Sequence, residues 1–464
     1  MYRSSIHIHF IGIGGVGMGG IAEILANLGY RVSGSDLKAG AAVEHLRSLG
    51  VAVHIGHSAE NITDAVSYVV VSSAISPNNP EILAAASRGI PVIPRAEMLS
   101  ELMRMKYGVA VAGSHGKTTT TTMVGEVLQA GALDPTVIVG GRVLTKPSGA
   151  SLGSGQFLVA EADESDGSFG LLRPAIAVVT NIDREHMSHY GSFGALEEAF
   201  FRFMSSVPFY GAVVACADDA VVEALCGKLK RRVLRYGIKP DADVCAKDIR
   251  IDNRGSRCTL VVNGSEADEL QLPIPGQHMI CNSLAAVAVG LELGVSLEAA
   301  LQGLKQFPGV ARRSQVLCQG ASCPTVIDDY GHHPQEIVAT LTAVRSAWFA
   351  DSDKGKLKVV FQPHRFTRTQ ELFGDFVGAF GNADELFVGP IYAAGEPPIE
   401  GVTAEALCSA IRDTDANYVE DLNQALDSLA RTATSDDVIV FLGAGDISRY
   451  AHSFAEKAGG GNKQ

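Results

Sequence analysis

The sequence lacks any long apolar run. No uninterrupted apolar stretch among its 464 residues approaches the ~18 residues of a membrane-spanning helix. The N-terminal stretch MYRSSIHIHFIGIGG has no cationic segment followed by a long apolar run, which predicts that there is no signal peptide. Net positive charge is also absent: the formal charge of −13 argues against a nucleic-acid or anionic-membrane surface, although a local basic pocket stays compatible with it.

Cysteine is present but without a metal-binding pattern. The eight cysteines form no CxxC pair and no zinc-type spacing. We therefore expect most of them to be small buried hydrophobic residues in a reducing, intracellular protein. They are Cys216, Cys226, Cys245, Cys258, Cys281, Cys318, Cys323 and Cys408.

The length predicts more than one domain. A chain of 464 residues is too long for one ordinary core, and 46% apolar residues with 50 glycines is typical of α/β proteins with tight strand-to-helix turns. Pro308 and Gly309 mark a hinge in KQFPGVARRSQ. We predict three domains, over residues 1–106, 107–309 and 310–464.

Strand-like and helix-like segments alternate through all three domains, which predicts parallel sheets covered by helices. The first domain is predicted to be Rossmann-like. The second is predicted to be a mostly parallel sheet of the P-loop ATPase kind, with antiparallel strands added over residues 243–273. The third repeats the order strand, loop and helix, and is predicted to be a second Rossmann-like unit.

A first glycine loop follows the strand predicted at residues 6–11. Gly12, Gly14 and Gly17 spell GxGxxG, and Asp36 lies nineteen residues past Gly17. Glycines let backbone N–H groups approach a diphosphate at a helix N-terminus, and the acid can hold ribose hydroxyls. A dinucleotide, another nucleotide diphosphate and a purely structural turn all fit, but no hydride-transfer partner is evident nearby.

A second glycine loop lacks one glycine of the Walker pattern, because Val111 stands five residues before Gly116. Gly113 to Thr118 still lies between an apolar strand and a helix. Lys117 can pair with the β- and γ-phosphates, and the Thr118 hydroxyl can reach Mg²⁺. The alternative is a glycine-rich turn with an exposed lysine.

Two later strands end in polar residues that suit a metal site. The strand in FLVAEADESD ends at Glu161, and the strand in AIAVVTNIDREHM ends at Asn181, with His186 soon after. A carboxylate, a hydroxyl and phosphate oxygens suit Mg²⁺, and the carboxyl ends of parallel strands meet at one sheet edge. We therefore predict a metal–ATP site there.

The third domain carries two polar loops, DDYGHHP and QPHRFTR, each after an apolar strand. Each alone is compatible with a plain surface loop. Together they predict an anion pocket, since guanidinium groups clamp carboxylates and phosphates. Arg312 and Arg313 stand at the hinge, where they could swing toward a nucleotide held by the second domain. The pocket residues are His332, His333, His364, Arg365 and Arg368.

These motifs, in this order, resemble the Mur ligase family, whose members join amino acids to the muramyl precursor of peptidoglycan. The resemblance spans nearly the whole chain, and the shortened GxxGKT loop is the family's own form. It is strongest to the members that attach L-alanine to the lactyl carboxylate of UDP-N-acetylmuramate. The motifs are HFIGIGGVGMGGIAE, AGSHGKTTTT, EADESDGSF, TNIDREHM, DDYGHHP and QPHRFTR.

The resemblance implies two nucleotide sites. The sugar-nucleotide site would contain Gly12, Gly14, Gly15, Gly17, Asp36, Ser72 and Ser73. The ATP site would contain Gly113, Ser114, His115, Gly116, Lys117, Thr118, Thr119, His278, Asn282, Arg313 and Asp328. Met279 stands where the family usually has an asparagine directly after His278, and Arg184 adds a charge beside the predicted metal site.

The resemblance also implies the chemistry. ATP and Mg²⁺ are the expected cofactors, with Mn²⁺ able to substitute, and Thr118, Glu161 and His186 are the expected metal ligands. The carboxylate would attack the γ-phosphate to give an acyl phosphate, which the amine of L-alanine would then attack. No lysine occurs in SVPFYGAVVACADD, so no carbamylated lysine is predicted. The expected catalytic residues are Lys117, Glu161, His186, His332, His364, Arg365 and Arg368.

The expected partners are small-molecule substrates only, with no nucleic acid and no membrane, for a bacterial cytoplasmic enzyme that is a monomer or weak homodimer. Three alternatives stay open at this point. A sister ligase would attach recycled tripeptide to the same sugar nucleotide. An NAD-dependent dehydrogenase would use the first loop but leave the second idle, and a non-catalytic nucleotide switch would use both without forming a product.

Overall fold

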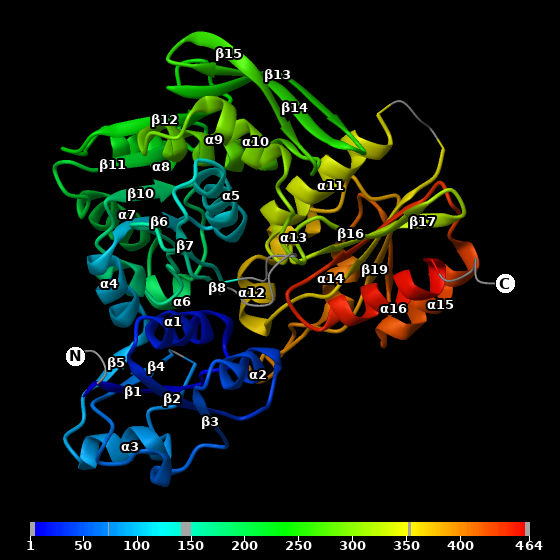
Figure 1. Ribbon diagram of the computed structural model, residues 1–464. Helices are drawn as coiled ribbons and strands as arrows, with labels where there is room; N and C mark the ends of the chain where they lie inside the picture. The colour runs from blue at the N-terminus through cyan, green and yellow to red at the C-terminus, as the bar shows by residue number, and fades with distance from the viewer. Residues whose placement is uncertain (1–4, 73, 141–149, 351–353, 460–464) are drawn as a thin grey trace. The chain divides into compact units, whose positions relative to one another are not determined.

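The structure is a computed structural model that describes residues 5–72, 74–140, 150–350 and 354–459 (Figure 1). Three sheets of five, ten and six strands follow one another along the chain, each with helices packed on it. Among the described residues, no helix combines the length and the apolar character needed to cross a membrane. The α/β class with three sheet-based domains is therefore confirmed.

The first sheet is entirely parallel, in the order β3-β2-β1-β4-β5. Its central strand, predicted at residues 6–11, spans His7–Ile11, and all five of its residues are buried. Both faces of a parallel sheet are covered, so apolar and polar positions alike lie inside. The elements are β1 (His7–Ile11), α1 (Val16–Asn27), β2 (Arg31–Asp36), α2 (Ala41–Ser48), β3 (Ala52–Ile55), β4 (Tyr68–Val71), α3 (Pro80–Ser87), β5 (Val92–Pro94) and α4 (Arg95–Met105).

The second sheet has the order β15-β14-β13-β12-β11-β10-β6-β9-β7-β8. Its strands from β13 to β7 pair in parallel, and β8 pairs antiparallel with β7. The strands are β6 (Tyr107–Ala112), β7 (Thr136–Ile138), β8 (Ala150–Ser151), β9 (Phe157–Glu161), β10 (Ile176–Val179), β11 (Ala212–Cys216), β12 (Val233–Gly237), β13 (Val244–Asp252), β14 (Gly255–Val262) and β15 (Ser265–Leu272). The helices are α5 (Lys117–Ala130), α6 (Met187–Tyr190), α7 (Phe193–Ser205), α8 (Ala220–Cys226), α9 (Gln277–Glu292) and α10 (Leu297–Lys305).

The added strands of the second sheet are hairpins, as predicted for residues 243–273. Asn263 and Gly264 join β14 to β15, with φ angles of 49° and 78°. Two consecutive residues with positive φ form a type I′ turn, whose twist suits a two-residue hairpin between antiparallel strands.

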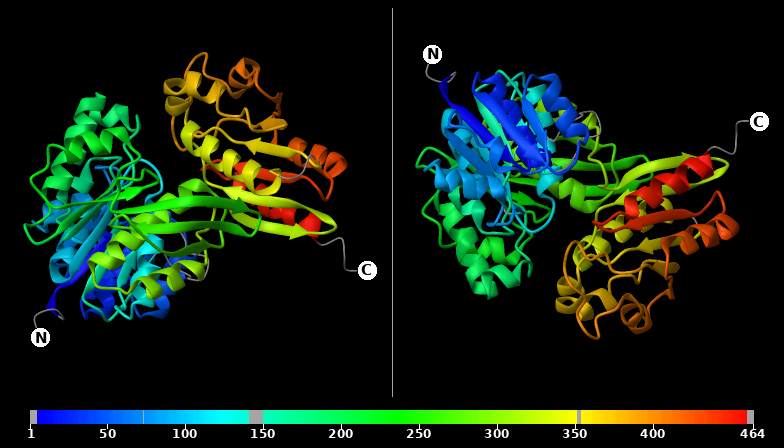
Figure 2. Two further views of the ribbon diagram at one scale, coloured as in Figure 1. Left: turned by 90° about the horizontal axis from the view of Figure 1, so that it is seen from above. Right: turned by 90° about the horizontal axis from the view of Figure 1, so that it is seen from below.

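The third sheet has the order β16-β17-β21-β18-β19-β20, parallel except for the antiparallel pair β16 and β17. Helices cover both faces of this sheet (Figure 2). Alternate strand residues enter two separate cores, Ile327 with α11, α13 and α14, and Val326 with α15 and α16. The strands are β16 (Gln315–Gly320), β17 (Cys323–Asp329), β18 (Leu357–Phe361), β19 (Glu385–Val388), β20 (Asp415–Tyr418) and β21 (Val438–Leu442). The helices are α11 (Pro334–Trp348), α12 (Phe366–Glu371), α13 (Phe373–Val377), α14 (Ala404–Ala410), α15 (Leu422–Thr432) and α16 (Ile447–Gly459).

The contacts divide the chain into two compact units. The first unit holds the first sheet and most of the second, and the second unit holds the third sheet. The division passes between Pro308 and Gly309, while β13, β14, β15 and α9 each begin in one unit and end in the other. The three domain boundaries stay predictions.

Candidate active site

The second glycine loop connects β6 to α5 and has a backbone that only glycine suits. Gly113 has a φ of 138°, and a Cβ there would lie 2.0 Å from Oγ1 of Thr180. Gly116 has a φ of 80°, and a Cβ there would lie 2.8 Å from Oδ1 of Asn282. Both glycines therefore allow neighbouring side chains to close on the loop. Asn282, predicted in the ATP site, lies directly against it.

The end of β10 holds this loop in place. The Thr180 hydroxyl donates to the carbonyl of His115 at 2.7 Å, and the N–H of His115 donates to Oδ1 of Asn181 at 2.8 Å. The His115 imidazole lies 3.2 Å from a carboxylate oxygen of Asp183. No side chain caps α5, so the backbone N–H groups at its first turn can meet an anion.

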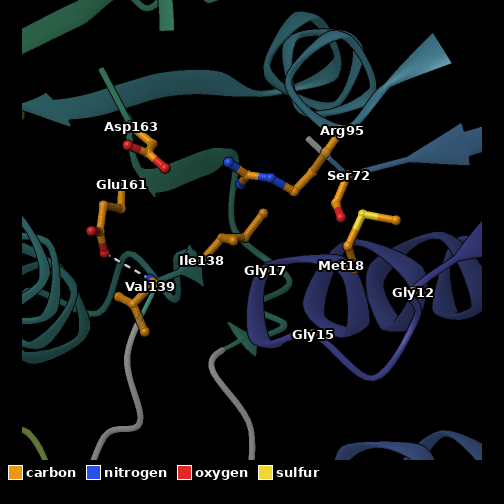
Figure 3. Close-up of a pocket in the computed structure, with 11 residues that line it drawn as sticks. Gly12, Gly15, Gly17, Met18, Ser72, Arg95, Ile138, Val139, Glu161 and Asp163 are labelled. Atoms are coloured by element: carbon orange, nitrogen blue, oxygen red, sulfur yellow. Dashed lines mark hydrogen bonds between the residues drawn. The ribbon is translucent and has the colours of Figure 1, made fainter. Parts of the chain in front are cut away.

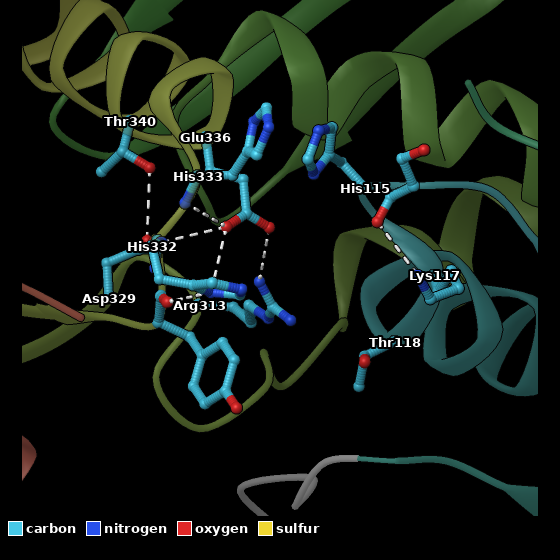
Figure 4. Close-up of polar contacts among 12 residues, drawn as sticks. His115, Lys117, Thr118, Arg313, Asp329, His332, His333, Glu336 and Thr340 are labelled. Carbon is cyan, nitrogen blue, oxygen red and sulfur yellow. Dashed lines mark hydrogen bonds and ion pairs between the residues drawn. The ribbon is translucent and has the colours of Figure 1, made fainter. Parts of the chain in front are cut away.

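Lys117 is the first residue of α5, and its side chain folds back over the loop (Figure 4). Its ammonium donates to the carbonyls of Gly113 and Ser114 at 2.7 and 3.0 Å, and to the Glu164 carboxylate at 2.9 Å. Burial favours the neutral amine, but the carboxylates of Glu164 and Glu161 outweigh it and raise the pKa of Lys117. The lysine therefore stays charged at neutral pH.

The end of β9 brings two predicted metal ligands together. Oε2 of Glu161 accepts a hydrogen bond from the Thr118 hydroxyl at 3.0 Å and another from the N–H of Gly140 at 2.7 Å. A hydroxyl and a carboxylate at this separation can share one cation, because both oxygens are hard ligands of the kind that Mg²⁺ takes.

A second group of ligands lies beside Lys117. The carboxylate of Glu164 is buried, and its Oε2 atom has no hydrogen-bond partner among the described residues. His186 lies 3.6 Å from Glu164 and 3.8 Å from Glu185, and one ligand atom from each of the three lies within 4.8 Å of the others. The buried, partly unsatisfied carboxylate fits a divalent cation.

The structure thus places His186 with two acids that the sequence prediction missed. Glu164 stands three residues after Glu161 in EADESD, and Glu185 directly precedes His186 in DREHM. Both lie inside motifs that were already singled out, so counting every acid at the strand ends would have found them. The residues beside Lys117 and at the end of β9 that can hold metal are Thr118, Glu161, Glu164, Glu185 and His186.

The first glycine loop opens on the same cavity as the end of β9 (Figure 3). The cavity has a volume of about 220 Å³. One wall comes from Gly12, Gly15, Gly17, Met18, Ser72 and Arg95. The other comes from Ile138, Val139, Gly140, Glu161 and Asp163. A group held by the first loop therefore has access to the acids beside the second loop.

Asp36 lies against the first loop, where its carboxylate accepts the N–H of Gly14 at 2.8 Å. A Cβ at Gly14 would lie 2.9 Å from the same carboxylate oxygen. Asp36 therefore fixes the loop backbone, and a contact with ribose stays a prediction. Ser72 lines the cavity, whereas Ser73 lies outside the described residues.

Arg95 is a cavity residue that the sequence prediction missed. It begins α4, and its Nη1 would lie 3.2 Å from a Cβ at Gly17. The carboxyl group of Asp163 is partly buried, which disfavours its charge, yet the Ser165 backbone, Lys117 and Arg95 together lower its pKa. The cavity thus contains a guanidinium beside the carboxyl groups of Asp163 and Glu161, a combination suited to an anion that is bound together with a cation.

In the second unit, the loop after β17 carries His332 and the loop after β18 carries His364, and their rings lie 5.7 Å apart. Tyr392 stacks on His364 at 5.7 Å and 10°, and Nη1 of Arg368 lies 3.2 Å from Nδ1 of His364. Burial lowers the pKa of His332 to about 3, despite the nearby Glu336. Burial, Arg368 and Arg365 lower the pKa of His364 to about 4. Both imidazoles are therefore neutral at pH 7.

Arg365 adopts a φ of 70°, a strained backbone for a residue other than glycine. Its N–H donates to the carbonyl of Tyr392 at 2.8 Å, and its guanidinium lies 3.9 Å from Glu396. The backbone and hydroxyl of Thr367 also donate to Glu396, at 3.1 and 2.8 Å. Tyr392 and Glu396, which the sequence prediction missed, thus hold the loop that bears His364, Arg365 and Arg368.

Glu336 organises the loop that bears His332 (Figure 4). It accepts the N–H groups of His332 and His333 at 3.1 and 3.3 Å and lies 3.6 Å from Arg313. The His333 side chain accepts the N–H of Gln335 and so caps α11. His333 therefore has a structural partner on its own helix, although it was predicted in an anion pocket.

Asp328 and Asp329 at the end of β17 are buried. Asp328 accepts the Ser448 hydroxyl at 2.6 Å, and burial raises its pKa. Burial also raises the pKa of Asp329 to about 6, and it accepts the N–H groups of Ser314 and Gly331 at 2.6 and 2.8 Å. Asp329 therefore fixes the backbone around it, Asp328 is tied to α16, and the role of Asp328 in ATP binding stays a prediction.

Two further predicted residues lie in the second unit. Arg312 donates to the carbonyls of Gly443 and Gly445, and its guanidinium lies 4.8 Å from the ring centroid of Tyr330. Burial and then Arg313 lower the pKa of His278 to about 4, so its imidazole is neutral. A neutral imidazole can both donate and accept hydrogen bonds, as base recognition needs.

Three family models match the chain in succession. The model for the Mur ligase family, catalytic domain, matches residues 7–107, that for the Mur ligase middle domain matches residues 111–290, and that for the Mur ligase, glutamate ligase domain, matches residues 312–445. Together they span most of the chain.

Named relatives and solved structures resemble the chain over nearly its full length. It is 50% identical to a UDP-N-acetylmuramate–L-alanine ligase of Sorangium cellulosum, over 97% of this chain and 96% of that one. It is 49% identical to a protein of the same name from Syntrophus aciditrophicus, over 97% and 92%. A crystal structure of UDP-N-acetylmuramate–alanine ligase from Thermotoga maritima matches with a TM-score of 0.81 and 29% identity, over 97% and 99%. A murein peptide ligase from Psychrobacter arcticus shares the fold, with a TM-score of 0.69 and 23% identity.

Proposed function

This chain belongs to the Mur ligase family, and from that premise we propose that it joins L-alanine to the lactyl carboxylate of UDP-N-acetylmuramate. ATP drives the ligation, and the products are UDP-N-acetylmuramoyl-L-alanine, ADP and phosphate. The reaction is a step of peptidoglycan precursor synthesis. Relatives at 49–50% identity that bear this activity in their names support the choice of substrate.

One observation carries the mechanism: the first glycine loop shares a cavity with Glu161, whose carboxylate hydrogen-bonds to Thr118 directly after the second glycine loop. Gly12, Gly15 and Gly17 would hold the diphosphate of the sugar nucleotide. Glu161, on the opposite wall, accepts the hydroxyl of Thr118 at the start of α5, beside the loop proposed to hold ATP. The lactyl carboxylate can therefore approach the terminal phosphate of ATP.

Phosphoryl transfer needs charge compensation, which the residues of the second loop can supply. A carboxylate oxygen attacks the γ-phosphorus, and the bond to the β–γ bridging oxygen of ATP breaks. The charged ammonium of Lys117 and the uncapped N–H groups of α5 would stabilise the negative charge on the transferred phosphoryl group. Mg²⁺, held through Thr118, Glu161 and the cluster of Glu164, Glu185 and His186, would neutralise phosphate charge when bound.

The second step forms the amide. The amine of L-alanine attacks the acyl carbon, the tetrahedral intermediate expels phosphate, and the nitrogen loses a proton. We propose that Arg365 and Arg368 bind the amino-acid carboxylate, since guanidinium pairs well with carboxylate. His332 and His364 are neutral at pH 7, so each can accept a hydrogen bond from the amine and orient it, while their low pKa values leave the released proton to water. His278, Asn282, Arg313 and Asp328 stay proposed ATP contacts.

The function is tested by measuring phosphate release with UDP-N-acetylmuramate and ATP, with either L-alanine or murein tripeptide as the amine. We expect release only when L-alanine is present, and a product mass equal to the sugar nucleotide plus one alanine residue. Lys117→Ala should abolish the product. Release with tripeptide alone would instead identify the sister ligase, which shares the fold.

Two other readouts separate the remaining alternatives. Turnover of NADH would favour a dehydrogenase, and binding of both nucleotides without any product would favour a nucleotide switch. We expect neither. Cytoplasmic location, the absence of nucleic-acid and membrane partners, and a monomeric or weakly dimeric state stay predictions that size-exclusion chromatography and cell fractionation can check.

A further inference from the structure

Two of the eight cysteines meet on the hairpin of β16 and β17. The Sγ atoms of Cys318 and Cys323 lie 2.9 Å apart. The pairing register shifts on both sides of Cys318, so this residue lies at irregularities of the edge strand, while Cys323 pairs with Gly320 beside the turn. The spacing C-x₄-C is not a metal-binding pattern, and only the hairpin shows that the two thiols face each other.

The pair is accessible on one side only. Cys318 is partly exposed, whereas Cys323 is buried with 7% of its surface accessible. Cys318 packs on the core beneath α15 and α16, and a Cβ at Gly459, the last residue of α16, would lie 3.3 Å from its Sγ atom. An oxidant from solvent therefore reacts with Cys318 first, and the buried Cys323 thiol is in position to react with the oxidised Cys318.

We propose that Cys318 and Cys323 are a redox pair that closes to a reversible disulfide when the protein meets a peroxide. The sulfur atoms must approach by roughly 0.9 Å, from 2.9 Å to the ~2.05 Å of a disulfide. That movement is small for an edge strand that already bulges. The inference does not depend on the proposed ligase activity.

The reaction balances with the peroxide as the two-electron oxidant. The Cys318 sulfur attacks one peroxide oxygen, the O–O bond breaks, and a sulfenic acid and water form. The Cys323 sulfur then attacks the sulfenic sulfur, the S–S bond forms, and the S–O bond breaks to release a second water with the Cys323 proton. Because the resolving thiol is already in contact, the sulfenic acid is captured before further oxidation.

The thiols are expected to react slowly. Burial, together with the neighbouring Cys323 thiol, raises the pKa of Cys318 to about 11, and the thiolate is the reactive form. The pair therefore stays reduced in a cytosol with abundant thiols and closes under sustained peroxide. Closure would link β16 to β17 near their turn, at the end opposite Gln315 and Asp329.

The test treats the full-length protein with hydrogen peroxide, blocks free thiols by alkylation, and maps the peptides by mass spectrometry. We expect a peptide pair joined through Cys318 and Cys323, a loss of two of the eight free thiols, and full recovery with dithiothreitol. Cys408→Ser, which removes a cysteine from a different core, should close the pair as the wild type does.

Two variants separate the steps. Cys323→Ser should leave Cys318 to proceed to sulfinic acid, which dithiothreitol does not reverse, and Cys318→Ser should form no disulfide at residue 323. Unchanged wild-type thiols, or sulfinic acid at Cys318 in the wild type, would overturn the proposal. The wild-type peptide map decides the matter even if a variant does not fold.

Discussion

Replacing Gly113 by alanine should damage ATP binding while the rest of the chain stays folded. The new Cβ would lie 2.0 Å from Oγ1 of Thr180 and 3.1 Å from the backbone N and O of Asn181, at a φ of 138°. The strained backbone costs about 2 kcal/mol. Displacing Thr180 breaks its bond to the His115 carbonyl, which costs about 1 kcal/mol. We expect the free loop to relax away from this conformation, so that ATP must restore it at a cost of about 3 kcal/mol, a loss of affinity of roughly a hundredfold.

The assay is calorimetric titration with a non-hydrolysable ATP analogue and Mg²⁺, together with the midpoint of thermal unfolding. Gly113→Ala with Thr180→Ala removes the overlap but keeps the strained φ, so the double variant should recover part of the affinity. Gly374→Ala is the matched control, because its Cβ would meet nothing within 4 Å. A Gly113→Ala protein that binds the analogue within threefold of the wild type would refute the argument.

Three further predictions concern the metal, the first sheet and pH. Thr118→Val removes the hydroxyl that Glu161 accepts, and should raise the Mg²⁺ concentration for half-maximal activity by roughly tenfold, whereas Thr118→Ser should not. Glu81 is buried and, although burial opposes it, the His9 imidazole 3.6 Å away and hydrogen bonds from Ser35 and Asn61 lower its pKa to about 2. Because the folded-state pKa of Glu81 lies below the unfolded one, the ionised carboxylate stabilises the fold by about 3 kcal/mol above pH 4.5, and this contribution is lost as the pH falls toward 2. Urea unfolding of Glu81→Gln should therefore show a lower free energy of unfolding at pH 7 and a weaker dependence of that free energy on pH. The pKa of His278 is lowered to about 4, so between pH 6.5 and 4 the unfolded chain binds the proton more tightly than the folded one. The free energy of unfolding should therefore decrease as the pH is lowered from 6.5 to 4, and it should decrease less in His278→Gln.

Most of the strands that the sequence predicted are buried on both faces, although the predicted strands β5 and β12 are partly exposed. Apolar runs such as IAVV in β10 and VIVFL in β21 indicate a buried strand directly. The prediction did not include β3, β16 and β20, and each of them is an edge strand of its sheet. Their residues are mostly exposed or partly exposed, so selection for apolar side chains is weak there.

The site residues could be predicted where they follow strands of one sheet, and could not where they come from elements that only packing brings together. Lys117, Thr118 and Glu161 follow strands of one parallel sheet, and the topology alone brings their ends together. Arg95 reaches the cavity from α4, beside the first sheet, and Glu396 holds Arg365 from a loop twenty-nine residues beyond Thr367. No local spacing encodes such contacts, because they depend on how sheets and loops pack.

The direct test of the central claim follows one oxygen atom. The account holds that the lactyl carboxylate of UDP-N-acetylmuramate attacks the γ-phosphate of ATP, and that the amine of L-alanine then displaces phosphate from the acyl carbon. When the carboxylate is labelled with ¹⁸O, mass spectrometry of the released phosphate should find one labelled oxygen per phosphate, in a reaction that requires L-alanine. Unlabelled phosphate formed together with the amide would show that the carboxylate is not activated by phosphoryl transfer, and would contradict the account.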